Sequence, residues 1–251
     1  MKKWFFYILI ALVIVFSWQY FGSTNNRTRM LISSPSLCVS YFQENWHTLL
    51  TSTLTTLIES ICGLFVATVV AFSLMLVCFK YKSFFNFILP VLLTTQVIPL
   101  ITLAPFFILW LGIGVSSKIA LAAVISFFPL FMNFATGYNS IAVNVFDLLD
   151  IYKANLSFRI FKVYFPLSLP NIFTGLKISA TLSVIGSIVA EFSGANVGLG
   201  KNLLLASIRI EPEMMMLSIF LSACIGGIIY CIIYLIERIV GRWYIGDKKL
   251  N

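Results

Sequence analysis

The chain has 251 residues, of which 60% are hydrophobic and only 10% are charged, and its mean hydropathy is +0.98. A soluble domain carries about 25% charged residues, so this composition excludes an ordinary water-soluble fold and indicates an integral membrane protein. The net charge of +8 does not indicate a nucleic-acid binder, because the basic surface of such proteins lies on a water-soluble fold. We expect residues 1–251 to form a single transmembrane domain in the lipid bilayer.

The sequence offers no pattern for metal, cofactor or covalent chemistry. Its five cysteines do not have metal-ligand spacing, and they indicate no disulfide framework. No nucleophile–base pair stands out, and the single histidine, His47, follows Trp46, as is typical of an interfacial anchor. We therefore expect no metal, no cofactor and no enzymatic activity.

Hydropathy predicts an all-α, polytopic bundle of six transmembrane helices, because a span needs about 20 apolar residues. The first stretch could instead be a signal peptide. However, its apolar run exceeds the usual ~7–15 residues, and no small-x-small cleavage site follows it. Residues 23–46 are expected to form a polar loop. The predicted spans are about 4–22, 57–79, 84–111, 118–137, 170–192 and 214–236.

Six spans place both termini on one side, and the positive-inside rule assigns that side. With the termini inside, eleven basic residues are cytoplasmic and five are outside, so both termini are expected in the cytoplasm. The inner set is Lys2, Lys3, Lys80, Lys82, Lys153, Arg159, Lys162, Arg238, Arg242, Lys248 and Lys249. The outer set is Arg27, Arg29, Lys118, Lys201 and Arg209.

The longest inner connection is residues 144–169. Its charges recur in steps of three or six, and three residues advance a helix by about 300°, so they cannot stay on one helical face. We expect a break at residues 155–157 and two short helices. Asn144 would cap the first, and Ser157 would cap the second, which would end before Pro166.

Apolar side chains stand between the charges of this loop: Leu148, Leu149, Ile151 and Tyr152. Such a projection needs a partner that buries it. The alternative is a helix that lies on the membrane surface.

Residues 147–166, DLLDIYKANLSFRIFKVYFP, resemble the EAA loop of bacterial ABC importer permeases. The resemblance continues through residues 171–177 and 189–200, and upstream through 96–99, 103–105, 110–114, 117–119 and 127–129. This ordered set covers about residues 49–243. It is similar to the binding-protein-dependent permeases for nitrate, sulfonate, taurine and thiamine precursors.

The resemblance implies a permease in the plasma (cell inner) membrane that imports a small organic solute or anion. The solute would be of the thiamine-pyrimidine or riboflavin type, or of the sulfonate, taurine or nitrate type. Implied partners are a cytoplasmic ATPase dimer, an extracytoplasmic solute-binding protein and a second permease copy. The implied ATPase-coupling residues are Asp147, Leu148, Leu149, Asp150, Ile151, Tyr152, Lys153, Ala154 and Asn155.

Two departures from the family pattern affect this loop. Asp147, Leu148 and Leu149 replace the Glu-Ala-Ala of the family, and Lys153 replaces its glycine. Because lysine adopts the left-handed conformation poorly, we expect the turn to move to Asn155, which tolerates it better.

The chain carries no phosphate-binding loop. The nearest match, residues 195–202, lacks the first glycine and has Asn202 where Mg²⁺ needs Ser or Thr. Hydrolysis of ATP is therefore expected on a separate chain.

Acidic residues inside membrane spans are costly and are candidates for function. Glu191 matches the family's Ala-Glu pair. It could line a gate with Gly194 and Gly198, or it could be a helix-end residue capped by the glycine turn. Glu59 could be functional or could bond a neighbouring helix. Gln96 and Pro99 could line the pathway where the third span is broken, although Gln96 could equally serve in packing.

A proton- or ion-coupled secondary carrier is the alternative function. Such a carrier would need a chain of carboxylates or histidines at mid-membrane, and two isolated acids make a poor relay. A purely structural subunit would not need the broken, charged loop at residues 144–169.

Overall fold

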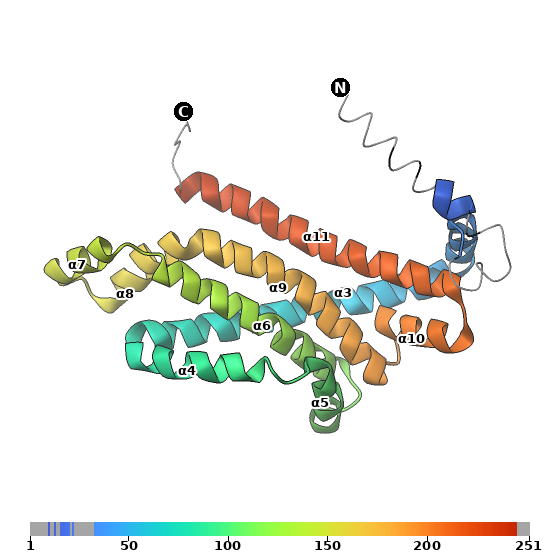
Figure 1. Cartoon of the computed structure of the whole chain (residues 1–251), viewed down its shortest axis with the longest axis horizontal. Coiled ribbons are helices and arrows are strands. Elements are labelled where there is room, and N and C mark those ends of the chain that lie inside the picture. Colours follow the sequence, from blue (N-terminus) through green and yellow to red (C-terminus); the bar gives the residue numbers. More distant parts are fainter. Residues whose placement is uncertain (1–9, 11–12, 14–15, 21, 23–32, 245–251) are drawn as a thin grey trace.

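The computed structural model describes residues 10, 13, 16–20, 22 and 33–244, so the predicted first span, 4–22, falls largely outside the described residues. Residues 33–244 contain helices and short turns without any strand (Figure 1). The helices are α3 (Pro35–Lys80), α4 (Lys82–Thr95), the 3₁₀ helix η1 (Leu100–Leu103), α5 (Ala104–Leu111), α6 (Val115–Asn139), α7 (Val143–Ile151), α8 (Leu156–Phe158), the π-helix η2 (Arg159–Tyr164), α9 (Phe165–Gly194), α10 (Leu199–Arg209) and α11 (Pro212–Tyr244).

Four helical segments of the described chain are long and apolar enough to cross a membrane. They are α3, α6, the continuous helix over 156–194, and α11. The predicted all-α membrane bundle is confirmed. The expected spans 57–79, 118–137, 170–192 and 214–236 lie within α3, α6, α9 and α11.

The predicted polar loop at 23–46 is wrong for the part that the structure describes. Helix α3 begins at Pro35, a residue suited to a first helical turn, and it continues through a local distortion at Asn45 (φ −118°, ψ 18°). Its polar side chains bond back to the helix itself, since Ser40 Oγ donates to the Ser36 carbonyl oxygen at 3.1 Å. A polar composition is therefore compatible with helix here.

The predicted third span, 84–111, is not one helix. Helix α4 ends at Thr95, and the chain becomes extended at Pro99 (φ −61°, ψ 105°) before η1 and α5. A proline disfavours helical backbone in the residue before it, which explains the break. Pro105 instead lies in the first turn of α5, where its missing N–H is tolerated.

Helix α6 packs closely on both α3 and α9, and these two helices also contact each other. Small residues allow this approach. A Cβ atom added to Gly63 of α3 would lie 2.5 Å from the Ala122 Cβ atom, and one added to Gly186 of α9 would lie 2.7 Å from the Ala122 Cα atom. The three backbones therefore meet at one level of the bundle through Gly63, Ala122 and Gly186.

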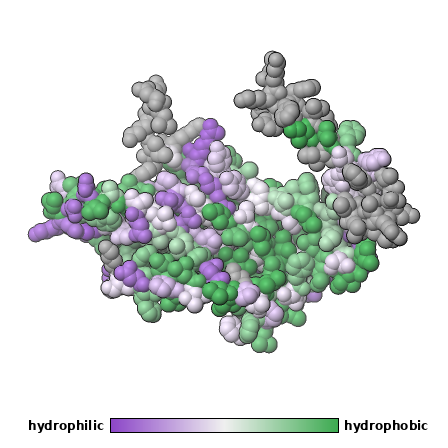
Figure 2. All heavy atoms as spheres, in the orientation of Figure 1, coloured by the Kyte–Doolittle hydropathy of each residue, from purple (hydrophilic) through white to green (hydrophobic). Residues whose placement is uncertain are grey.

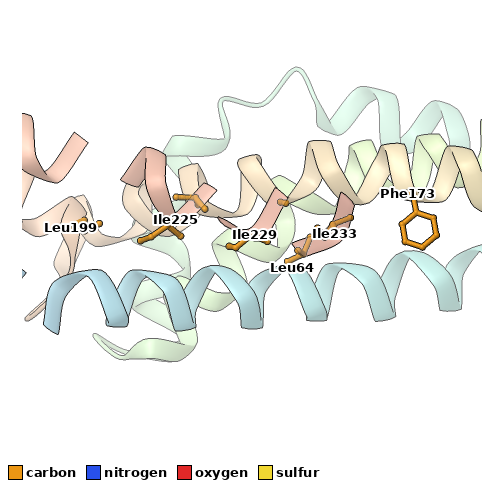
Figure 3. Packing of buried hydrophobic residues seen from close by; sticks show 8 residues of the cluster. Leu64, Phe173, Leu199, Ile225, Ile229 and Ile233 are labelled. Atoms are coloured by element: carbon orange, nitrogen blue, oxygen red, sulfur yellow. The ribbon is translucent and has the colours of Figure 1, made fainter. Parts of the chain in front are cut away.

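An apolar cluster fills the space where α11 covers α3 and α9. Figure 3 shows Leu64 with Ile225, Ile229 and Ile233 between these helices, and Phe173 further along α9. On the face drawn in Figure 2, hydrophobic residues spread over the long helices, while hydrophilic residues gather at the end that holds α7 and α8. This distribution is typical of a bundle surrounded by lipid.

The two ends of the bundle hold different connections. Ser33 Oγ donates to Glu213 Oε1 at 2.9 Å, which joins the start of α3 to the start of α11 beside α10. Towards the opposite end, the Lys177 ammonium pairs with Glu237 Oε2 at 2.8 Å and ties α9 to α11. The α7–α8 connection and α10 thus lie at opposite ends (Figure 1).

We predict that Gly186→Ala lowers the melting temperature of the detergent-solubilised protein, because the added methyl group collides with the α6 backbone. Overpacking costs roughly 1–3 kcal/mol, and each kcal/mol corresponds to about 2–4 °C for a chain of this size. The matched control is Gly226→Ala in α11, where nothing lies within 4 Å of an added Cβ atom. Equal melting temperatures for the two variants would contradict the close packing.

Candidate functional site

The loop at residues 144–169 is broken as expected, but the break lies at 152–155 and not at 155–157, and the caps also differ from expectation. Helix α7 begins after Ala142, whose backbone is extended (φ −61°, ψ 140°), so Asn144 is inside the helix and is not its N-cap. The Ala142 carbonyl oxygen already accepts from Val145 N at 3.0 Å. A backbone turn therefore starts the helix without a side-chain cap.

The turn after α7 lies at Lys153 and not at Asn155. Lys153 has a φ of +47°, and two backbone bonds hold it there: Lys153 N donates to Asp150 O, and Ala154 N donates to Leu149 O, both at 3.0 Å. These bonds form a Schellman motif, which outweighs the unfavourable left-handed conformation of lysine. Asn155 instead is the N-cap of α8, a role predicted for Ser157, and its Oδ1 accepts from Phe158 N at 2.8 Å.

Arg159 holds the end of α7 against the start of the next helix. Its Nε donates to the Ala154 carbonyl oxygen at 2.8 Å, and its Nη2 donates to the Leu149 carbonyl oxygen at 3.0 Å. Its Nη1 lies 2.5 Å from Asp150 Oδ1. The guanidinium group therefore adds a second bond to the Leu149 carbonyl oxygen and gives the Ala154 carbonyl oxygen a partner. In the sequence, Arg159 was only one of the inner positive charges.

The predicted helix end before Pro166 is also wrong, because the chain stays helical from 156 to 194. The turn before this proline is the π-helix η2, and Phe165 N donates to the Ile160 carbonyl oxygen five residues back. The wider π turn makes room for the proline ring, which would otherwise clash with the preceding turn. The loop and the long α9 helix are therefore mechanically continuous.

The exposed face of α7 carries most of the expected apolar residues. Leu148 is 53% exposed, and Ile151 and Tyr152 are each 76% exposed. Leu149 departs from expectation: it is buried in a cluster with Ile160 and Tyr164 of η2. A cavity of about 600 Å³ opens beside this face, with Leu148, Lys153 and Phe158 in its lining. Of the remaining predicted coupling residues, Asp147, Asp150 and Asn155 are exposed and Ala154 is half-buried.

At the opposite end, Glu191 joins three helices. Its Oε1 accepts from Thr56 Oγ1 of α3 at 2.7 Å, and its Oε2 accepts from the backbone N–H of Gly200 in α10. Thr56 Oγ1 also accepts from Leu199 N at 2.9 Å. Side chains of α3 and α9 thus hold the first N–H groups of α10, where the helix dipole favours an acidic partner.

Glycine is required where α10 begins. Gly198 has a φ of +143°, and a Cβ atom there would lie 2.3 Å from Glu191 Cδ. The sequence prediction that groups Glu191 with the glycine turn therefore has a geometric basis. Gly194 is the last residue of α9, where an added Cβ would lie 3.3 Å from Ile108 Cδ1.

Two further buried groups lie near Glu191. The Glu59 carboxyl group is 1% exposed and lies beside the Glu191 carboxyl group, with Lys118 also within electrostatic range. Lys118, which was expected at a loop boundary, is 4% exposed and donates to the Gly114 carbonyl oxygen at 2.8 Å. Gln96 and Pro99 are exposed in the turn between α4 and η1, on a separate segment.

Sequence reasoning missed the matching polar stripes that assemble this cluster. On α3, buried small or polar residues recur at 52, 56, 59, 60 and 63, and on α9 at 179, 183, 186, 187, 190 and 191. Ser60 Oγ donates to Ser187 Oγ at 3.1 Å between the stripes. Spacings of three and four residues mark one helical face, so this signal was present in the sequence.

Residues 61–245 match the family described as the inner membrane component of binding-protein-dependent transport systems. The chain belongs to this family of permeases. The match begins in the middle of α3 and includes both the Arg159-braced loop and the Glu191 cluster.

Relatives in the same family are named as transport permeases. The chain is 33% identical to the riboflavin transport system permease of Chloroflexus aurantiacus over 61% of its own length and 58% of that protein. It is 31% identical to the formylaminopyrimidine transport permease of Halalkalibacterium halodurans over 72% of each chain. It is 29% identical to a putative aliphatic sulfonates permease of Bacillus subtilis over 61% of this chain and 56% of that protein.

These similarities place the chain in the predicted branch of ABC permeases, as a multi-pass membrane subunit of a transport system. Members of the family work with a solute-binding protein and a separate ATPase.

We predict that Lys153→Gly stabilises the turn after α7 by about 1 kcal/mol, because glycine adopts a positive φ without the penalty that lysine bears. Amide hydrogen exchange at 149–154 should slow about fivefold if the turn opens locally. Lys162→Gly is the control. Because this residue lies inside η2, where glycine destabilises the helix, the substitution should accelerate amide hydrogen exchange. Faster exchange in Lys153→Gly would contradict the strained turn.

Proposed function

We propose that this permease carries a small organic solute into the cytoplasm, and that its α7 surface is the docking site for a cytoplasmic ATPase dimer. The observation that carries the proposal is the exposed apolar face of α7, with Leu148, Ile151 and Tyr152, on an element that Arg159 holds rigid. Exposed apolar residues on a rigid support are typical of an interaction surface.

The continuity of this element with α9 supports a route for coupling. The π-helix η2 joins the docking surface directly to the 30-residue helix α9, which ends at the Glu191 cluster. Closure of the ATPase dimer would move two such docking surfaces together. We therefore propose that two permease copies act as a homodimer, or as an equivalent pair, whose pathway alternates between outward and inward access.

The basic-residue bias supports the orientation of this assembly. The α7 end and both termini would face the cytoplasm, while α10 and the start of α3 would face the solute-binding protein outside. The six predicted spans, with 4–22 as a retained first helix, remain part of this proposal.

The proposed solute is a small organic molecule or anion, because the relatives are named for riboflavin, formylaminopyrimidine and sulfonates. A proton- or ion-coupled carrier is not favoured, since the relatives are named as permeases of transport systems.

Glu191, Gly194 and Gly198 are proposed to form the outer gate, with Gln96 and Pro99 along the pathway. The support is geometric, because Thr56 and Glu191 hold the first N–H groups of α10 in place. Release of these bonds would free the start of α10 to move.

The docking proposal is tested by the double substitution Leu148→Asp and Ile151→Asp. Each exposed apolar anchor is expected to contribute about 2 kcal/mol to binding, or roughly thirtyfold in affinity, so the ATPase should no longer co-purify and uptake should cease. Membrane abundance should stay normal, because both side chains face outward from the fold.

The conservative pair Leu148→Met and Ile151→Leu serves as the control and should retain both ATPase co-purification and uptake. Retention of the ATPase and of transport by the aspartate variant would remove the docking proposal.

The gate proposal predicts that Thr56→Val leaves Leu199 N without its acceptor, which costs about 1–3 kcal/mol. Amide exchange at Leu199 and Gly200 should accelerate roughly tenfold or more, and binding-protein-stimulated ATP hydrolysis should lose its dependence on solute. Thr56→Ser keeps the hydroxyl group and should behave as the natural protein. Identical exchange in Thr56→Val would show that the bond does not restrain α10.

A further inference from the structure

A polar cavity of about 510 Å³ lies at the α10 end of the bundle, between the first turns of α3 and the outer face of α10. It is distinct from the Glu191 cluster, since neither Glu191 nor Glu59 lines it. Pockets of roughly 300–1,000 Å³ are the size that holds small organic ligands. The cavity therefore has room for a small solute.

Among its described residues, the wall of this cavity contains basic side chains and no carboxylate. Lys201 and Arg209 of α10 and His47 of α3 line it, and no aspartate or glutamate does. Lys201 Nζ donates to the Asn196 carbonyl oxygen, which is a neutral acceptor. Neither basic residue belongs to an ion pair found among the described residues. The lining thus favours a negatively charged ligand.

The nearest acidic side chains lie outside the lining. Glu213 accepts from Ser33 Oγ at 2.9 Å, and it is engaged there with the start of α3. Glu211 acts electrostatically on Tyr41, which belongs to the cavity wall. These groups border the site without entering its lining, so they limit its positive potential but do not neutralise Lys201 directly.

The wall of the cavity also contains a buried amide. Asn202 is 4% exposed and lines the cavity, and its Nδ2 atom has no hydrogen-bond partner in the described part of the chain. That atom has less than 1 Å² of accessible surface, so a ligand in the cavity does not reach it unless the side chain rotates. Asn202 is therefore a neutral part of the wall, and Lys201 supplies the charge.

We propose that this cavity is a binding site for the anionic group of a small organic solute, with Lys201 supplying the charge. Arg209 and His47 would add positive or donor groups at the rim, and Leu205 and Met214 would contact the body of the solute. The inference rests on the proposed function, because it places this solute at the α10 end beside the start of the proposed pathway.

The test uses the full-length permease in phosphatidylcholine nanodiscs, without its ATPase. The probes are benzoate and benzamide, which match in size and shape but differ in charge, and saturation-transfer NMR measures their binding. Benzoate should bind at least tenfold more tightly than benzamide. Benzamide also reports partition into lipid, since it is the less polar of the two.

Three substitutions assign the site. Lys201→Gln should weaken benzoate binding about tenfold, the usual worth of a charge-assisted hydrogen bond. Lys201→Arg should restore it, which excludes misfolding as the cause. Asn202→Asp should abolish it by placing a like charge in the wall. Lys80→Gln, at the other end of α3, is the matched control and should have no effect.

Equal binding of the two probes, or unchanged benzoate binding in Lys201→Gln, would overturn the proposal. Loss of benzoate binding when phosphatidylglycerol replaces part of the phosphatidylcholine would also overturn it, in favour of a lipid headgroup site. Because no ATPase is present, failure here would leave the docking and transport proposals standing. Failure of ATPase co-purification would, in turn, leave this binding result unaffected.

Discussion

The close approach of α3, α6 and α9 through Gly63, Ala122 and Gly186 is the contact on which the rest of the structure depends. Within lipid, apolar side chains gain little by leaving one hydrocarbon environment for another, so helices associate through tight packing and hydrogen bonds. The absence of larger side chains at this level brings the backbones together. Only at that distance can Ser60 reach Ser187 and Thr56 reach Glu191. Packing of small residues and bonding of polar ones are thus two parts of one interface.

The same interface links the two ends of the molecule. Helix α9 begins in the π-helix beneath the Arg159-braced turn and ends at the carboxylate that holds α10. Because α9 packs along α6 over much of its length, a displacement at one end is transmitted as a movement of a rigid helix. The continuous helix over 156–194 has 39 residues and joins the proposed docking surface to the proposed gate.

Composition and hydropathy predicted the membrane bundle and most of its long helices, since the length of an apolar run determines a span with little help from tertiary structure. The wrong predictions concern residues whose local sequence preference is overridden by hydrogen bonds or packing in the folded chain. Lys153 was expected to avoid a positive φ, yet the Schellman bonds hold it there. Pro166 was expected to end a helix, yet the π turn accommodates it. Leu149 was expected to be exposed, but its burial depends on residues of the next helix. The pairing of Thr56 with Glu191, 135 residues apart in the chain, depends on the fold and could be inferred only from the shared spacing of the two polar stripes.

The measurement that tests the account most directly is site-specific photo-crosslinking of the permease in membranes that contain its ATPase. A benzoylphenylalanine side chain at position 151, on the exposed face of α7, should form an adduct with the ATPase chain. The same side chain at position 208, exposed on α10 at the opposite end, should form none. An ATPase adduct from position 208, or its absence from position 151 in an actively transporting complex, would contradict the account.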